Sequence, residues 1–170
     1  MRSRRPDKLD REPLAYFITF RCFGTWLPGD VRGWTDRPVH ARDMSLRSSH
    51  PGLQSIARDA MADSLFTLER PHRQTVVAAI RDVYAHRGGT LHALNVRTNH
   101  VHLVVSANSS PDQAMTVLKA WSTRRLREVG LIAEGVKPWS RHGSTRYLWR
   151  VDQIEAAVSY VLEGQGRDLD

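Results

Sequence analysis

Residues 90–106, Thr-Leu-His-Ala-Leu-Asn-Val-Arg-Thr-Asn-His-Val-His-Leu-Val-Val-Ser, contain the pattern that decides the fold. Both 90–97 and 100–106 are short runs rich in apolar and β-branched residues, which is typical of strands. The few residues between the runs, around Thr98 and Asn99, suit the turn of a hairpin. The sequence therefore predicts a pair of neighbouring antiparallel strands.

Two histidines, His100 and His102, lie two positions apart in the second of these strands. Alternate side chains of a strand share a face, so the two imidazoles project together while Val101, Leu103 and Val105 point into the core. Two imidazoles at this spacing on a rigid strand are well placed for one divalent ion. The alternative is a pair of surface histidines that bind nothing.

The rest of the chain surrounds this strand pair with further strands and helices. Mixed strands and helices with a hairpin predict an α+β fold, an antiparallel sheet with helices on one face. We expect one domain over 1–170, with a flexible basic arm at 1–13 and a loop and helix insertion at 24–72. The expected elements are a strand over 14–21, a weak helix over 53–68, a helix over 73–87, a helix over about 110–129, a loop over 131–144, a short strand over 145–150 and a helix over 153–163.

The charge balance points to nucleic acid. Lys and Arg number 25 against 18 Asp and Glu, which gives a net charge of +7 and a sequence pI near 10.3. Most of the basic residues are arginine, whose planar fork suits phosphate and stacks on bases. A codon bias towards arginine is the alternative.

The single cysteine, Cys22, excludes a disulfide framework and a multi-cysteine zinc site, and we expect it to be buried. No apolar run is long enough for a membrane span, so the sequence predicts a soluble cytoplasmic protein.

The last predicted helix, 153–163, carries a tyrosine away from its apolar face. Tyr160 lies well off that face, and Glu163, three residues on, shares its side. A tyrosine beside a metal-binding face can act as a phenolate nucleophile once a divalent ion offsets the developing charge. An amphipathic surface tyrosine is the alternative.

These motifs together resemble a known family. His100-Val101-His102 resembles the His-hydrophobic-His signature of the HUH endonucleases. The stretch 160–165, Tyr-Val-Leu-Glu-Gly-Gln, resembles the tyrosine helix of the single-tyrosine transposases, both the insertion-sequence type and the REP-associated type. The strand 17–21 and the segment 95–102 are also similar to that family. The resemblance implies an HUH endonuclease fold of the ferredoxin-like (RRM-like) kind.

The resemblance also implies a reaction and a cofactor. Tyr160 would attack a backbone phosphate of single-stranded or hairpin DNA, form a 5′-phosphotyrosine link and release a 3′-OH. His100, His102 and a third polar ligand would hold Mg²⁺ or Mn²⁺. In the insertion-sequence branch of the family the third ligand is a glutamine one helical turn after the tyrosine, but Gly164 occupies that position here and Gln165 follows it. The resemblance favours Gln165, whereas ideal helix geometry favours Glu163, because Gln165 lies about 140° from Tyr160 and Glu163 only about 60°.

Arginines and tryptophans interleave along the chain, a composition that suits single-stranded nucleic acid. The expected DNA contacts are Arg21, Trp26, Trp34, Arg124, Arg125 and Arg127. A solvated helix end is the alternative for the last three arginines. Trp121 and Trp149 are expected in the core.

Other functions stay open at this point. An inactive or domesticated relative would bind structured single-stranded DNA without cutting it, and another HUH nickase would use the same chemistry. A metal-dependent ribonuclease or hydrolase built on His100 and His102 is more distant. The sequence leaves a monomer and a homodimer equally open.

Overall fold

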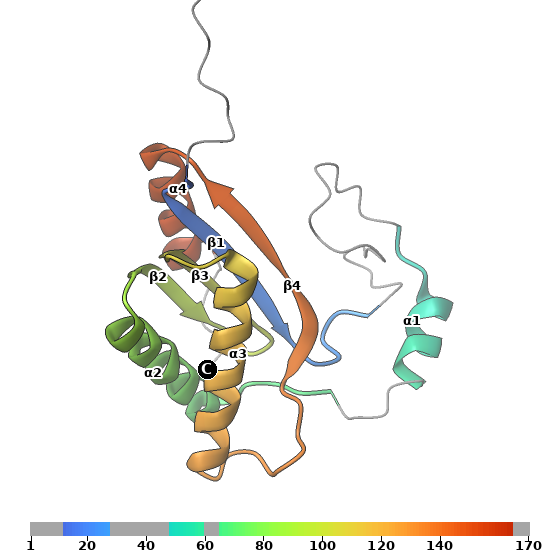
Figure 1. The fold of residues 1–170 in the computed structure, drawn as a ribbon. Coiled ribbons are helices and arrows are strands. Elements are labelled where there is room, and N and C mark those ends of the chain that lie inside the picture. The colour runs from blue at the N-terminus through green and yellow to red at the C-terminus, as the bar shows by residue number, and fades with distance from the viewer. Residues whose placement is uncertain (1–11, 28–47, 60–64, 165–170) are drawn as a thin grey trace, which may run out of the picture.

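The computed structural model describes residues 12–27, 48–59 and 65–164. Four strands and four helices follow one another in the described part of the chain (Figure 1). In chain order they are β1 (Ala15–Cys22), α1 (Pro51–Asp59), α2 (Arg70–Arg87), β2 (Thr90–Val96), β3 (His100–Ser106), α3 (Pro111–Glu128), β4 (Trp139–Leu148) and α4 (Val151–Glu163).

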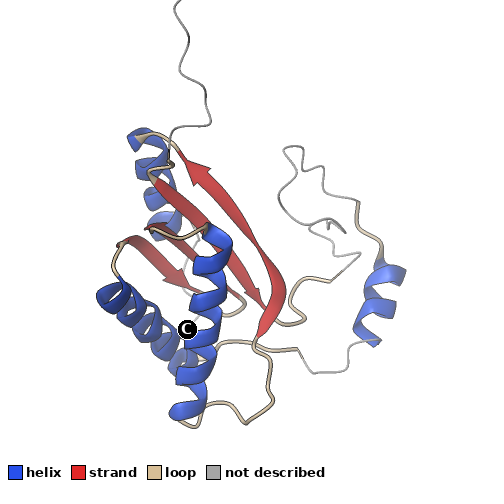
Figure 2. Ribbon diagram, viewed as in Figure 1, coloured by secondary structure: helices blue, strands red, loops and turns tan. Residues whose placement is uncertain are grey.

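The four strands form one sheet in the order β2-β3-β1-β4, and every neighbouring pair is antiparallel (Figure 2). α2 lies between β1 and β2 in the chain, and α3 lies between β3 and β4. This is the β-α-β-β-α-β order of the ferredoxin-like arrangement, with α1 inserted between β1 and α2 and α4 added at the end. The predicted α+β fold and the predicted hairpin of β2 and β3 are confirmed.

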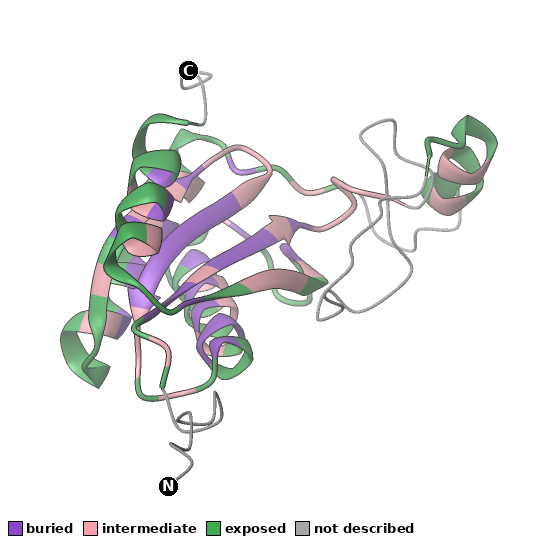
Figure 3. Cartoon of the chain, turned by 90° about the horizontal axis from the view of Figure 1, so that it is seen from above, coloured by how far each residue is buried: buried purple, intermediate pink, exposed green. Residues whose placement is uncertain are grey.

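Helices cover both faces of the sheet, so the expectation of helices on one face is wrong. α2 and α3 pack on one face, against a core that includes Ile18, Phe20 and Leu103. α4 packs on the other face, where Ala157 and Val161 contact a smaller core around Val104 and Leu148. Figure 3 shows buried strands between these two layers. The second layer forms because the two central strands carry apolar side chains on both faces.

β4 begins at Trp139 and ends at Leu148, whereas a strand over 145–150 is expected, so the expected loop over 131–144 is wrong for residues 139–144 and correct for 131–138. Residues 143–148 pair with β1 although the stretch is polar, because β4 is an edge strand. Gly143 fits this pairing: a Cβ there would lie 2.5 Å from the Thr19 carbonyl oxygen and would also contact Met115.

The weak helix expected over 53–68 is shorter in the structure. α1 ends at Asp59, and residues 65–69 are not helical. The Phe66 N–H donates to the Phe23 carbonyl at 3.1 Å, and the Leu68 N–H donates to the Thr98 carbonyl at 2.7 Å. These long-range bonds, together with the full burial of Leu68, hold the segment extended.

The expectation that Trp121 and Trp149 lie in the core is wrong, whereas the expectation that Cys22 is buried is confirmed. Trp121 is 40% exposed on α3, and Trp149 is 46% exposed just after β4. Cys22 is fully buried, and burial raises the pKa of its thiol to about 12. Among the helices of the described ranges, none combines the length and the apolar character that crossing a bilayer requires.

Candidate active site

The face of the sheet under α4 is here called the site face. Residues opposite each other on antiparallel strands share a face. Thr19 of β1 pairs with His102 of β3, and Arg21 pairs with His100. Alternation along β1 puts Phe17 on the same face. The strand pairing therefore places the two histidines on the same face as Phe17, Thr19 and Arg21.

The two imidazoles lie side by side on this face, with ring centroids 4.5 Å apart. His102 is only 7% exposed, and its Nδ1 lies 2.7 Å from the Thr19 hydroxyl oxygen. His100 is less buried, and its Nδ1 lies 2.5 Å from the Asn99 side-chain oxygen. An amide oxygen only accepts hydrogen bonds, so Nδ1 of His100 carries the ring proton.

This arrangement fits a divalent metal ion. Partners on Nδ1 fix the ring orientation, as the outer shell of a histidine ligand usually does, so that Nε2 is the nitrogen that could bind a metal ion. Burial, and then the charges of His100 and Arg21, lower the pKa of His102 to about 3. The His102 imidazole is therefore neutral at physiological pH, as a metal ligand must be.

Tyr160 reaches the same site from α4. Its ring centroid lies 5.9 Å from that of His102 and 5.9 Å from that of Phe17. Phe17 stacks on His102 at 5.5 Å, so the three rings are in mutual contact. Tyr160 is still 48% exposed, because it lies beside the apolar stripe through Ala157 and Val161. A substrate can therefore approach the phenol while the rings of His102 and Phe17 support it.

A polar side chain of β2 attaches the end of α4 to the sheet. Asn95 pairs with His102 in the sheet, and its Nδ2 donates to the Val161 carbonyl at 2.9 Å. That carbonyl is in the last turn of α4, where the helix itself leaves carbonyls without partners. Asn95 thus holds the residue that follows Tyr160.

Gly164 at the end of α4 lies directly against the tyrosine. A Cβ at this position would lie 2.9 Å from Cδ2 of the Tyr160 ring and 2.8 Å from the Tyr160 carbonyl oxygen. A larger residue would therefore displace the ring or the helix end. The departure from the family pattern at position 164 has a local reason in this close contact.

The two expected candidates for a third ligand have different outcomes. The Glu163 carboxylate accepts a hydrogen bond from Ser159 at 3.3 Å. In the described ranges, no three side chains of His, Cys, Asp or Glu gather into a group that could hold a metal ion, so Glu163 does not join the histidine pair there. Gln165 lies outside the described residues.

The expected DNA contacts separate into two groups. Arg21 lies on the site face, and its guanidinium carbon is 3.8 Å from the ring centroid of Trp26. Arg124 and Arg125 are on α3, beyond the opposite face, and both bind Glu128, at 2.8 Å and 3.3 Å.

Arg127, on the same helix, donates to the Val136 carbonyl at 3.3 Å. Only Arg21 and Trp26 are thus near the site; Trp34 lies outside the described residues.

Sequence reasoning did not assign roles to Phe17, Thr19 and Asn95. Their only sequence signal is alternation within β1 and β2, which places each residue on one of two faces. Which partner each side chain meets depends on the pairing of the strands, and a single sequence does not specify that pairing.

One comparison with known proteins matches part of the chain to a family. Residues 63–146 match the family model described as "Transposase IS200 like". This range contains His100 and His102 and ends before α4, which carries Tyr160. No curated protein matches the chain.

A solved structure of a REP-associated tyrosine transposase bound to a REP hairpin is 12% identical, with a TM-score of 0.49. The alignment covers 95% of this chain and 70% of that one. The match of residues 63–146 to the IS200-like transposase model bears out the resemblance to the single-tyrosine transposases that the sequence motifs indicated.

Proposed function

We propose that the protein is a metal-dependent endonuclease and strand transferase that cuts and rejoins single-stranded or hairpin DNA through Tyr160. The observation that carries this proposal is the meeting of His100, His102 and Tyr160 on one face, although the tyrosine comes from a separate helix. A transposase of the matched family needs a nucleophile beside its metal ligands, and α4 supplies a phenol there.

The reaction is a transesterification. The Tyr160 oxygen attacks a backbone phosphorus, a new Tyr O–P bond forms, and the P–O3′ bond breaks. The phenol proton is lost and the departing 3′ oxygen gains a proton, so a 3′-OH is released and the 5′ side stays linked to tyrosine. A 3′-OH then attacks the phosphotyrosine and restores the phenol. Because one phosphodiester bond replaces another, no external energy source is required.

The chain's own residues have distinct tasks in this scheme. His100 and His102 would hold Mg²⁺ or Mn²⁺, which when bound polarises the scissile phosphate and offsets its developing charge. Thr19 and Asn99 orient the two imidazoles. Arg21, which pairs with His100 in the sheet, would bind a phosphate of the strand.

The test is covalent capture of DNA. The protein is incubated with Mn²⁺ and labelled single-stranded DNA from the regions flanking its coding sequence, and adducts are resolved on a denaturing gel. We expect an adduct with the native chain and none with Tyr160→Phe, which keeps the ring and removes the hydroxyl. Tyr147→Phe, an exposed tyrosine on β4, is the matched control. An adduct that persists in Tyr160→Phe would refute the assigned nucleophile.

The same assay separates the main alternative. A relative that only binds DNA forms no adduct in the native chain, yet retains DNA in a gel-shift experiment. Gln165→Ala and Glu163→Ala then distinguish the two third-ligand candidates. We expect Gln165→Ala to lose Mn²⁺-dependent cleavage, and an active Gln165→Ala would exclude this glutamine.

A further inference from the structure

An exposed tryptophan lies between two arginines on the helices that cover the face opposite the site. Trp121 of α3 is 40% exposed. The guanidinium carbon of Arg87, at the end of α2, lies 5.7 Å from its ring centroid, and that of Arg124 lies 5.6 Å away. We call these three residues the Trp121 patch.

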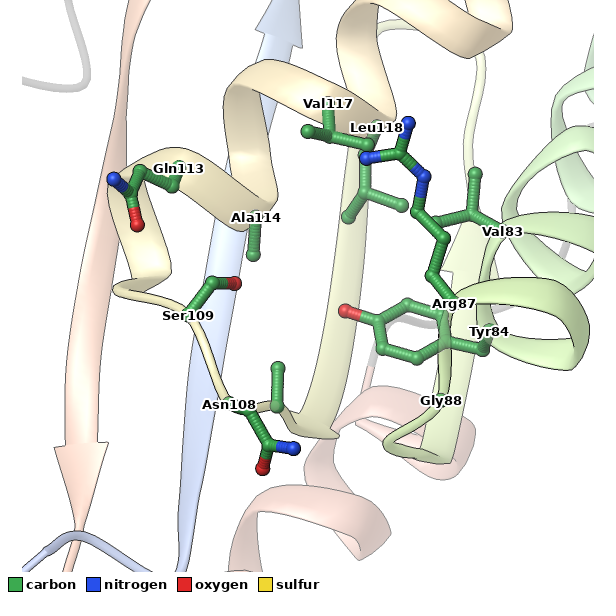
Figure 4. A pocket seen from close by; sticks show the side chains of 11 residues that line it. Val83, Tyr84, Arg87, Gly88, Asn108, Ser109, Gln113, Ala114, Val117 and Leu118 are labelled. Carbon is green, nitrogen blue, oxygen red and sulfur yellow. The ribbon is translucent and has the colours of Figure 1, made fainter.

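A pocket of about 270 Å³ adjoins this patch between α2 and α3. Arg87 lines the pocket and also borders Trp121, so the two features are continuous. Figure 4 shows the Arg87 side chain extending from the end of α2 towards Val117 and Leu118 of α3. Val117 is one helical turn before Trp121, which places the tryptophan next to the pocket.

The pocket is lined by both apolar and polar side chains. Val83, Val117 and Leu118 supply the apolar side chains. Asn108, Ser109 and Gln113 supply amide and hydroxyl groups, which offer both donors and acceptors to the edge of a base. A flat heteroaromatic ring with a polar edge matches this combination.

The charge of the patch decides between ligand classes. Arg87 and Arg124 lie against the same indole ring. Arg125 is next to Arg124 on α3, and both donate hydrogen bonds to a single carboxylate, that of Glu128. The net charge of these four side chains is therefore positive, as is that of the whole chain. Exposed aromatic rings that bind bases, beside arginines that bind phosphates, are the means by which proteins bind single-stranded nucleic acid.

We propose that the Trp121 patch and the adjoining pocket bind two consecutive unpaired nucleotides of the DNA, away from the site of cleavage. One base stacks on Trp121, its neighbour enters the pocket, and the phosphate between them lies at Arg87. The sheet separates this surface from Tyr160, so it holds flanking DNA rather than the reacting phosphate. The proposal rests on the proposed function only in taking DNA as the ligand.

The test measures binding without cleavage. A fluorescein-labelled oligothymidylate, which has no paired structure, is titrated with the full chain in EDTA, and affinity is read from fluorescence anisotropy. Trp121→Ala should weaken binding by roughly fivefold or more, the size of one lost stacking contact. Trp121→Phe should recover part of the loss. Trp149→Ala, an equally exposed tryptophan outside the patch, should bind as the native chain does.

Arg87→Ala should weaken binding and reduce the salt dependence by about one phosphate contact, while Arg81→Ala, on another side of α2, should not. Photocrosslinking of an iododeoxyuridine-containing oligonucleotide should map to the α3 peptide that contains Trp121. Native affinity in Trp121→Ala, or crosslinks confined to other peptides, would overturn the proposal.

These results are independent of the adduct assay. If Tyr160→Phe still forms an adduct but Trp121→Ala loses affinity, the nucleophile is wrong and the binding surface stands. If Trp121→Ala binds normally while Tyr160→Phe loses the adduct, only the binding surface is wrong.

Discussion

The two faces of the sheet are built from the same strands but contain different chemistry. The face under α2 and α3 is apolar along both central strands, whereas the site face carries both apolar and polar side chains. Facing α2 and α3 are Ile18, Phe20, Val101, Leu103 and Val105, and on the site face are Phe17, Thr19, Arg21, His100, His102 and Val104. One face therefore contributes the larger part of the buried apolar core, and the other holds the side chains of the candidate site on a rigid support.

The largest expected effect is on the site face. His102→Ala should abolish metal-dependent cleavage, because the more buried of the two proposed imidazole ligands is lost. Adduct formation across a Mn²⁺ titration measures this, and circular dichroism checks that the fold persists. Val104→Ala, two residues on and on the same face, is the control: it should lower stability and retain cleavage. Undiminished cleavage by His102→Ala would refute the proposed metal site.

The opposite face should respond in the reverse manner. Leu103 is fully buried against the α2 and α3 side, so Leu103→Ala should lower the free energy of unfolding by about 2–5 kcal/mol. Urea denaturation measures the loss. At a temperature where the variant is folded, its adduct rate should stay close to native. A variant that is stable but inactive would contradict the division between the faces.

A subtler change tests the support of the metal ligand. Thr19→Val removes the hydroxyl that contacts Nδ1 of His102 but keeps the shape of the side chain. We expect the Mn²⁺ concentration for half-maximal cleavage to rise roughly 10- to 100-fold, as for other partners of histidine ligands. Thr19→Ser keeps the hydroxyl and should behave as native. An unchanged Mn²⁺ requirement in Thr19→Val would show that this contact does not orient the ring.

The smallest effect concerns the attachment of α4. Asn95→Ala removes one hydrogen bond to the Val161 carbonyl, which should lower stability by about 0.5–1.5 kcal/mol. The adduct rate should fall more than Mn²⁺ affinity, because Tyr160 moves while the histidines remain. Hydrogen exchange of the last turn of α4 should increase. Equal losses of rate and Mn²⁺ affinity would mean that Asn95 supports the histidines instead.

Much of the fold follows from local patterns in the chain. The hairpin of β2 and β3 and the helix α3, with its capping box at Ser110 and Gln113, are recognisable because their signals lie within a few residues. The start of β4 was missed because residues 139–144 lack strand periodicity, and their pairing with β1 depends on a distant strand. The segment 65–69 was missed for the same reason.

The same distinction between local patterns and long-range contacts applies to the candidate site. The sequence alone determined that His100 and His102 share a face, because the side-chain period of a strand is two. It also determined that Tyr160 lies off the apolar stripe of its helix. Only the tertiary structure decided that α4 covers the histidine face, that Thr19 lies opposite His102 and that Asn95 binds the end of α4. These contacts join residues far apart in the chain, and they depend on strand register and helix docking, which are set by the packing of the whole core.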